Sequence, residues 1–128
     1  LVADDDESSR IYFSRQLRQY DLVVTTVETG RQAIDLAREQ SFDLILLDIL
    51  MPEMNGFQVL EALKSDLILR HTPVVMVSGL DDLDSLVRCI ELGAEDYLFK
   101  PLNPTLLKAR ISACLERKRL RDKEQAYL

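Results

Sequence analysis

Apolar runs of strand length recur along the chain and are separated by segments of helical spacing. The predicted strands are Leu1–Ala3, Leu22–Val27, Phe42–Leu47, Val74–Val77 and Tyr97–Phe99. The middle runs are continuous rather than alternating, which is typical of strands buried on both faces of a parallel sheet. We therefore predict five strands, and we expect the chain to be a fragment that starts within the first of them.

The segments between these runs carry apolar residues three to four positions apart, as one face of a helix does. These positions are Phe13, Leu17 and Tyr20, then Ala33, Leu36 and Ala37, then Phe57, Leu60 and Leu63, and then Leu83, Val87 and Ile90. Helix boundary signals agree with this spacing. They are the capping-box pairs Thr29/Gln32 and Asn55/Gln58, the pair Asn103-Pro104, and Gly93 as a stop.

Strand and helix alternate five times, which predicts an α/β domain with a doubly wound five-stranded parallel sheet. Ligands of such sheets bind at the carboxyl ends of the strands. The residues expected there are Asp4, Asp5 and Asp6 after the first strand, Asp48 after the third, Ser78 and Gly79 after the fourth, and Lys100 and Pro101 after the fifth. This edge is the candidate site.

Carboxylates that converge from two strand ends repel one another and raise their own pKa values unless a cation neutralises them. Oxygen ligands without a nearby His or Cys favour a hard ion such as Mg²⁺, which leaves positions free for phosphate oxygens. Lys100 adds a positive charge and Ser78 a hydroxyl group at the same edge. Phosphoryl transfer requires this set of groups, so we predict that Asp48 becomes an acyl phosphate.

Four motifs resemble, in order and spacing, the signature of response-regulator receiver domains of two-component signal transduction. They are Asp4-Asp5, the run Leu46–Gly56 around Asp48, Val77-Ser78-Gly79 and Phe99-Lys100-Pro101. The resemblance covers Leu1 to about Leu115 and implies the flavodoxin-like (βα)5 receiver fold. Gly79 stands where the family commonly has alanine, and Ser78 where it more often has threonine; both departures leave the chemistry in place.

The resemblance implies a metal site around the acceptor. Asp48 would be the phospho-acceptor, and Asp4 and Asp5 would be the acidic pair that serves Mg²⁺, with Mn²⁺ as a substitute. Asp48 itself and the backbone carbonyl of Leu50 would also be ligands of the ion.

The resemblance also implies the groups that respond to the phosphate. Lys100 would contact the phosphoryl group, and Ser78 and Tyr97 would form the conformational switch, with Tyr97 moving inward after Ser78. The Lys100-Pro101 step matches one that is commonly cis in the family.

The implied partners are a sensor histidine kinase or a histidine phosphotransfer protein as donor, and a downstream output domain or effector. The effector would contact the fourth helix, fifth strand and fifth helix, and a homodimer is a further partner. On the fourth helix we expect Leu83, Val87 and Ile90 to face the core, which leaves Arg88 and Glu91 outside.

Two leucines suggest a long phosphoryl lifetime. Leu50 and Leu80 each lie two residues beyond a predicted site residue, and polar side chains at these positions of the family can orient the attacking water. We therefore predict slow self-dephosphorylation. The alternative is that both leucines cover the apolar underside of their loops.

The chain divides into a predicted receiver domain at 1–115 and a helical extension or linker at 116–128, towards an absent output domain. Leu107, Ile111, Cys114 and Leu115 should pack on the domain. The heptad positions are Ala113, Leu120 and Tyr127. They suggest a coiled-coil transmitter, and a solvated helix end is the alternative.

Composition narrows the remaining possibilities. With 16 Lys plus Arg against 22 Asp plus Glu, the net charge of −6 argues against direct nucleic-acid binding. Cys89 and Cys114 lack metal-site spacing and fit reduced thiols in a cytoplasm. No apolar run suits membrane insertion or a signal peptide, so we expect a cytoplasmic protein. His71 receives no role.

Two other functions use nearly the same residues. A Mg²⁺-dependent phosphatase resembling the haloacid dehalogenase group would employ Asp4 and Asp6 for catalysis and Ser78 and Lys100 for phosphate binding. Such enzymes need a further acidic pair after the lysine and a cap insertion, for which this chain has no room. A phosphorylation-independent interaction domain is disfavoured because no acidic, hydroxyl or lysine position is missing.

Overall fold

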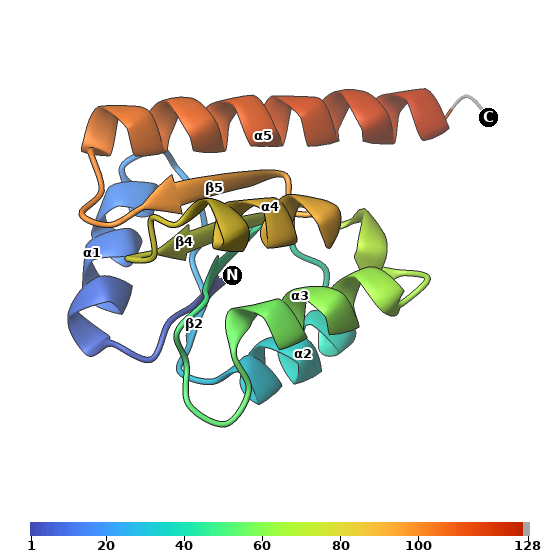
Figure 1. Ribbon diagram of the computed structural model, residues 1–128. Coiled ribbons are helices and arrows are strands. Elements are labelled where there is room, and N and C mark those ends of the chain that lie inside the picture. The colour runs from blue at the N-terminus through green and yellow to red at the C-terminus, as the bar shows by residue number, and fades with distance from the viewer. Residues whose placement is uncertain (127–128) are drawn as a thin grey trace.

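The computed structural model describes residues 1–126 and contains one five-stranded parallel sheet in the order β2-β1-β3-β4-β5. The strands are β1 (Val2–Ala3), β2 (Thr26–Val27), β3 (Ile45–Asp48), β4 (Val74–Ser78) and β5 (Asp96–Phe99). The helices are α1 (Glu7–Arg18), α2 (Gly30–Glu39), α3 (Gly56–Ser65), the short 3₁₀ helix η1 (Leu69–His71), α4 (Leu83–Glu91) and α5 (Pro104–Gln125). The doubly wound α/β fold is confirmed (Figure 1).

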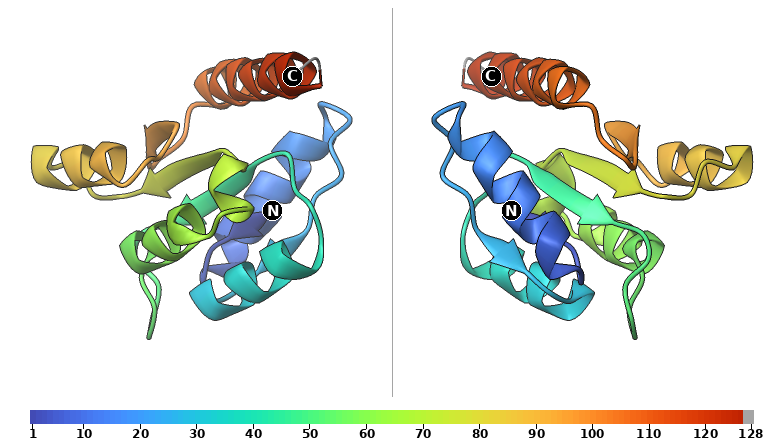
Figure 2. Two further views of the ribbon diagram at one scale, coloured as in Figure 1. Left: turned by 90° about the vertical axis from the view of Figure 1, so that its right-hand side faces the viewer. Right: turned by 90° about the vertical axis from the view of Figure 1, so that its left-hand side faces the viewer.

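Helices cover both faces of the sheet and divide the core into two clusters (Figure 2). On one face α1 and α5 contribute Phe13, Leu17, Leu107, Ile111 and Cys114. On the other face α2, α3 and α4 pack over the sheet. Because the sheet is buried on both sides, its carboxyl edge is where polar side chains reach solvent.

Two strands are shorter than their apolar runs. The run Leu22–Val27 forms a strand only at Thr26–Val27, and Val23 is 97% exposed. The run Phe42–Leu47 likewise enters the sheet only at Ile45. Leu22, Val24 and Phe42 still pack against the core from loops. Most of these apolar residues are therefore partly buried by loops rather than by strands, and Val23 is not buried at all.

Two site residues belong to strands rather than following them. Asp48 is the last residue of β3 and Ser78 the last residue of β4, where they pair with Val77 and Phe99 respectively. The parallel ladder thus fixes both backbones at the sheet edge.

The predicted helix starts are confirmed. Thr29 and Asn55 each accept a hydrogen bond from the backbone of the residue three positions on, in complete capping boxes. Asn103 caps α5, which has Pro104 in its first turn. Gly93 follows the end of α4 at a φ of 101°, where a side chain would be strained.

The predicted inner face of α4 is wrong. Leu83, Val87 and Ile90 are 70%, 41% and 59% exposed. Cys89 is fully buried and Leu86 packs against the core instead. Both sets have helical spacing in this short helix, so the pattern could not decide between them, whereas contact with the sheet did. 

Arg88 is exposed as predicted, and it also contacts α3. Its guanidinium lies 4.1 Å from the centre of the Phe57 ring, so this exposed side chain bridges α4 to α3. Glu91 is exposed as predicted.

The last helix packs as predicted over its first half. Leu107, Ile111 and Cys114 are buried and Leu115 packs against them. The helix continues without a break to Gln125. Of the heptad positions, Ala113 and Leu120 are exposed and Tyr127 lies outside the described residues.

Ion pairs hold the distal half of α5 against the domain. The Glu95 carboxylate, which precedes β5, lies 3.5 Å from Arg117 and 2.8 Å from Arg121. Within residues 1–126, none of the helices combines the length and apolar character that crossing a membrane requires.

Candidate functional site

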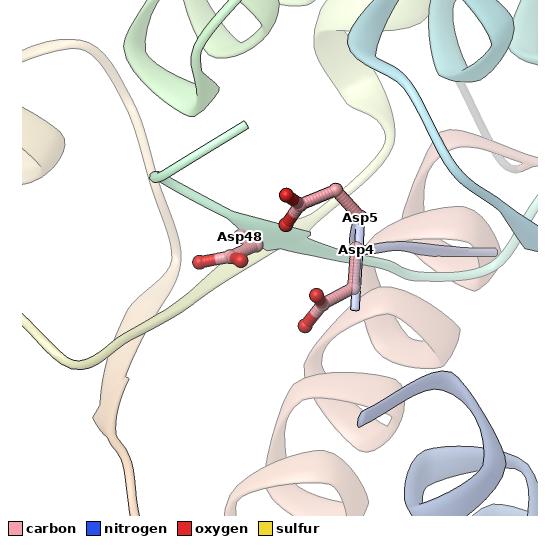
Figure 3. Close-up of side chains that lie close together, drawn as sticks. All are labelled: Asp4, Asp5 and Asp48. Carbon is pink, nitrogen blue, oxygen red and sulfur yellow. The ribbon is translucent and has the colours of Figure 1, made fainter. Parts of the chain in front are cut away.

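Three carboxylates meet at the carboxyl edge of the sheet. Ala3 of β1 pairs with Leu47 of β3, so Asp4 and Asp48, the next residue of each segment, lie side by side. Asp4 and Asp48 are 1% and 6% exposed, whereas Asp5 is exposed. One carboxylate oxygen from each lies within 4.8 Å of the others, and Figure 3 shows the side chains turned toward a common space.

Lys100 supplies a positive charge to this cluster. Lys100 directly follows β5. Its Nζ donates a 2.9 Å hydrogen bond to Asp4 and lies 3.5 Å from Asp48. The Lys100-Pro101 peptide is cis, as the resemblance implied. Three carboxylates with one ammonium leave a net negative site, which suits a divalent cation.

The surroundings shift the pKa values of Asp48 and Lys100. Burial, followed by the charge of Asp4, raises the pKa of Asp48 to about 6. Burial alone would lower the pKa of Lys100, but its hydrogen bond to Asp4 and the charge of Asp48 outweigh that effect and raise it. Lys100 is therefore a permanent cation beside a carboxyl group whose ionised form is costly.

The donor set fits a hard metal ion. The oxygen atoms of Asp4, Asp5 and Asp48 are hard ligands, and the exposure of Asp5 leaves one side open to solvent. Mg²⁺ keeps several waters in protein sites, so an open side is what such a site requires. The Leu50 backbone carbonyl as a further ligand stays a prediction.

Asp6 is not part of this set. Its carboxylate caps α1 by accepting hydrogen bonds from the backbone N–H and the hydroxyl of Ser9. Those hydrogen bonds lower the pKa of Asp6. Asp6 thus serves the start of α1 rather than the carboxylate cluster.

Ser78 and Tyr97 share one neighbour, Leu80. The buried Ser78 hydroxyl accepts a 3.2 Å hydrogen bond from the Leu80 N–H, and the Tyr97 hydroxyl donates one of 2.7 Å to the Leu80 carbonyl. Tyr97 is only 7% exposed, so its ring is buried in this structure, and its role in the switch stays a prediction.

The two leucines have different surroundings. Leu50 is 58% exposed, and its N–H lies 3.4 Å from an Asp48 oxygen. Leu80 is partly buried and packs against the core. Of the two leucines, Leu50 is therefore the more exposed beside the predicted acceptor Asp48.

Two residues at this edge were given no role of their own in the sequence analysis. A Cβ atom on Gly56 would lie 2.3 Å from the Asp48 carbonyl oxygen, so the loop after β3 can close against the strand only with glycine. Arg10, one turn into α1, donates a 2.9 Å hydrogen bond from Nη1 to the Asp4 carbonyl. Arginine is common on helix surfaces, and every residue has a main-chain oxygen. The residue types alone therefore could not reveal this contact.

Comparison with known proteins gives one consistent family. The sequence model of the family described as the response regulator receiver domain matches residues 1–112 of this chain. The two-component response regulator ORR3 of Oryza sativa subsp. indica is 39% identical over 106 residues, 82% of this chain and 81% of that protein. The signal receiver domain of a signal transduction histidine kinase from Syntrophus aciditrophicus superposes with a TM-score of 0.83 at 30% identity, covering 90% of this chain and 87% of that chain.

Several relatives are much longer than this chain. The 3',5'-cyclic-nucleotide phosphodiesterase regA of Dictyostelium discoideum is 35% identical over 130 residues, covering 99% of this chain but 16% of that protein. The chain spans 27% to 48% of the length of three other curated relatives. The similarity therefore concerns one shared domain.

Proposed function

Because the chain belongs to the response regulator receiver domain family, we propose that Asp48 is the phosphoryl acceptor and that Asp4 and Asp5 hold Mg²⁺ beside it. One observation carries this proposal: three carboxylates and the Lys100 ammonium converge at one sheet edge from three separate segments. Asp48 is the member that ends the central strand β3 and lies within reach of both the acidic pair and the lysine.

The chain's own residues account for most of the reaction. An Asp48 carboxylate oxygen forms a bond to phosphorus as the bond from phosphorus to the donor group breaks, which leaves an acyl phosphate on Asp48. Lys100 neutralises a phosphoryl oxygen, and the Ser78 hydroxyl donates to another. When bound, Mg²⁺ supplies further charge neutralisation for the phosphoryl oxygens.

The conformational response follows from the hydrogen bonds of Ser78. In this proposal the Ser78 hydroxyl turns toward the phosphoryl group on Asp48 and gives up its hydrogen bond from the Leu80 N–H, so phosphorylation releases Leu80 from one of its two anchors. Tyr97 retains the other. The loop between β4 and α4 is thus the segment whose equilibrium shifts.

The proposed readout surface consists of α4, β5 and α5. Its large exposed apolar residues include Leu83, Val87, Ile90, Phe99 and Leu106. Apolar side chains gathered beside the switch loop support contact with an output domain or effector, and a homodimer through this surface is a second candidate. Phosphoryl donors would be a sensor histidine kinase or a histidine phosphotransfer protein.

The proposed function also includes the domain boundaries of the chain, the scope of its catalysis and its location. We assign residues 1–115 to the receiver domain and 116–128 to a helical extension or linker towards a further domain. The chain's catalysis is limited to its own phosphorylation and slow dephosphorylation, whatever activity a longer protein has. The buried free thiols of Cys89 and Cys114 support a reducing cytoplasmic location.

Intact-mass measurement with Mg²⁺ and a small phosphodonor such as acetyl phosphate tests the acceptor. One acid-labile phosphoryl group should appear on the parent protein and be lost in Asp48→Asn. The matched control Asp43→Asn removes an exposed carboxylate elsewhere and should label normally. Full labelling of Asp48→Asn would refute the assignment, and absence of any adduct on the parent would favour a phosphorylation-independent interaction domain.

A generic phosphoester assay separates the receiver from a phosphatase. The receiver should give no turnover beyond background. Turnover that is lost in Asp4→Asn but kept in Asp48→Asn would instead support the haloacid dehalogenase-like alternative.

A further inference from the structure

Arg10 joins three segments around the acidic cluster. From α1 its Nη1 donates a 2.9 Å hydrogen bond to the carbonyl oxygen of Asp4, and its Nη2 lies 3.6 Å from the Glu28 carboxylate. The Arg10 side chain is only 15% exposed, whereas that of Glu28 is 68% exposed. Glu28 follows β2 and directly precedes Thr29, the residue that caps α2.

The Asp4 carbonyl belongs to the peptide that links Asp4 to Asp5. That peptide is planar, so fixing its oxygen also fixes the direction in which the backbone enters Asp5. Asp4 has further anchors, because its carboxylate accepts hydrogen bonds from Lys100 and from the Asp6 N–H. The exposed Asp5 side chain depends instead on the backbone from which it projects.

We propose that Arg10 is a positioning residue for the metal site, which it serves by holding the Asp4-Asp5 peptide so that the Asp5 carboxylate turns toward Asp48. The inference rests on the proposed Mg²⁺ site and adds a residue that does not touch the ion. Groups that orient ligands in this way commonly contribute about tenfold or more to metal affinity.

Geometry and charge make opposite predictions for Arg10. A guanidinium near the site repels a divalent cation, so removing its charge should tighten Mg²⁺ binding if electrostatics dominated. Removing the hydrogen bond should weaken binding if orientation dominates. The sign of the change therefore separates the two explanations.

The test measures Mg²⁺ affinity without phosphodonor, by calorimetry or by amide shifts in NMR. Arg10→Gln should raise the Mg²⁺ dissociation constant roughly tenfold. Arg15→Gln removes the same charge from an exposed position on the same helix and should leave the constant unchanged. Titrations are run below the thermal midpoint of each variant. Glu28→Gln, at an exposed carboxylate, provides a mild second variant that should weaken binding by less.

A double-mutant cycle shows whether Arg10 acts through Asp5. If it does, Arg10→Gln should cause no further loss of affinity in an Asp5→Asn background. The proposal is overturned by an unchanged or tighter dissociation constant in Arg10→Gln, or by the same loss in both backgrounds. If the parent protein itself does not bind Mg²⁺, the proposed metal site fails, which is a different result from normal binding by both parent and Arg10→Gln.

Discussion

The Tyr97 hydroxyl donates a 2.7 Å hydrogen bond to the backbone carbonyl of Leu80. Since the Leu80 N–H in turn donates to Ser78, a single residue of the loop after β4 is held from both sides by the two proposed switch residues. We therefore expect a change at Ser78 to reach Tyr97 through Leu80.

Tyr97→Phe should loosen this loop while leaving the fold intact. The variant keeps the buried ring and loses one hydrogen bond, so the free energy of unfolding should fall by about 1 kcal/mol. Amide hydrogen exchange should accelerate in the loop between β4 and α4. The control Tyr20→Phe removes the hydroxyl of a ring whose centre lies 5.5 Å from the Lys108 Nζ, and it should leave this loop unaffected. Unchanged exchange in Tyr97→Phe would contradict the coupling.

Asp48→Asn should stabilise the metal-free protein above pH 6. Burial and Asp4 raise the pKa of Asp48 to about 6, so the fold favours the protonated form, and ionisation as pH rises through 6 costs stability. The gain should be roughly 1 to 3 kcal/mol at pH 8 and should vanish near pH 4. Urea unfolding at both pH values measures it, with Glu61→Gln on the surface of α3 as the control. An equal gain at both pH values would rule out this cause.

Substitutions on the two faces of α4 should differ in cost. Ile90→Gln lies on the exposed apolar face and should change the free energy of unfolding by no more than about 0.5 kcal/mol. Leu86→Ala removes a side chain that packs on the core and should cost roughly 1 to 3 kcal/mol. Chemical denaturation compares them directly. A larger loss of stability in Ile90→Gln than in Leu86→Ala would instead support the inner face that the sequence predicted.

Polar side chains beside the acceptor should shorten the life of the acyl phosphate. The Leu50→Asn, Leu80→Glu double variant should dephosphorylate faster in Mg²⁺, because polar groups can orient the attacking water. Leu50 is the more exposed of the two, so Leu50→Asn alone should produce most of the effect. Decay kinetics after removal of the phosphodonor provide the measurement, and equal rates in parent and variants would show that these side chains do not control water access.

Local pattern was sufficient for much of the fold. Capping boxes such as Thr29 with Gln32 lie within a few residues of the chain, so the sequence contains all their atoms. The buried runs of β3 and β4 are apolar because helices cover both faces of the sheet. Since the carboxyl ends of parallel strands share one edge, the alternation of strands and helices was enough to place Asp4, Asp48 and Lys100 at the same edge, where they lie in contact.

Tertiary structure decided what local pattern leaves open. On α4, two apolar faces have similar spacing, and only the position of the sheet selected Cys89 and left Ile90 exposed. The contact of Arg10 with the Asp4 carbonyl joins a side chain to a main-chain oxygen, which every residue has, so no residue type marks it in advance. The sequence by itself determined the order of elements along the chain and the chemistry at the strand ends, because periodicity, capping and the alternation of strands and helices are properties of the chain. The exposed face of α4 and the support of Asp5 depended on what lies opposite each side chain in three dimensions.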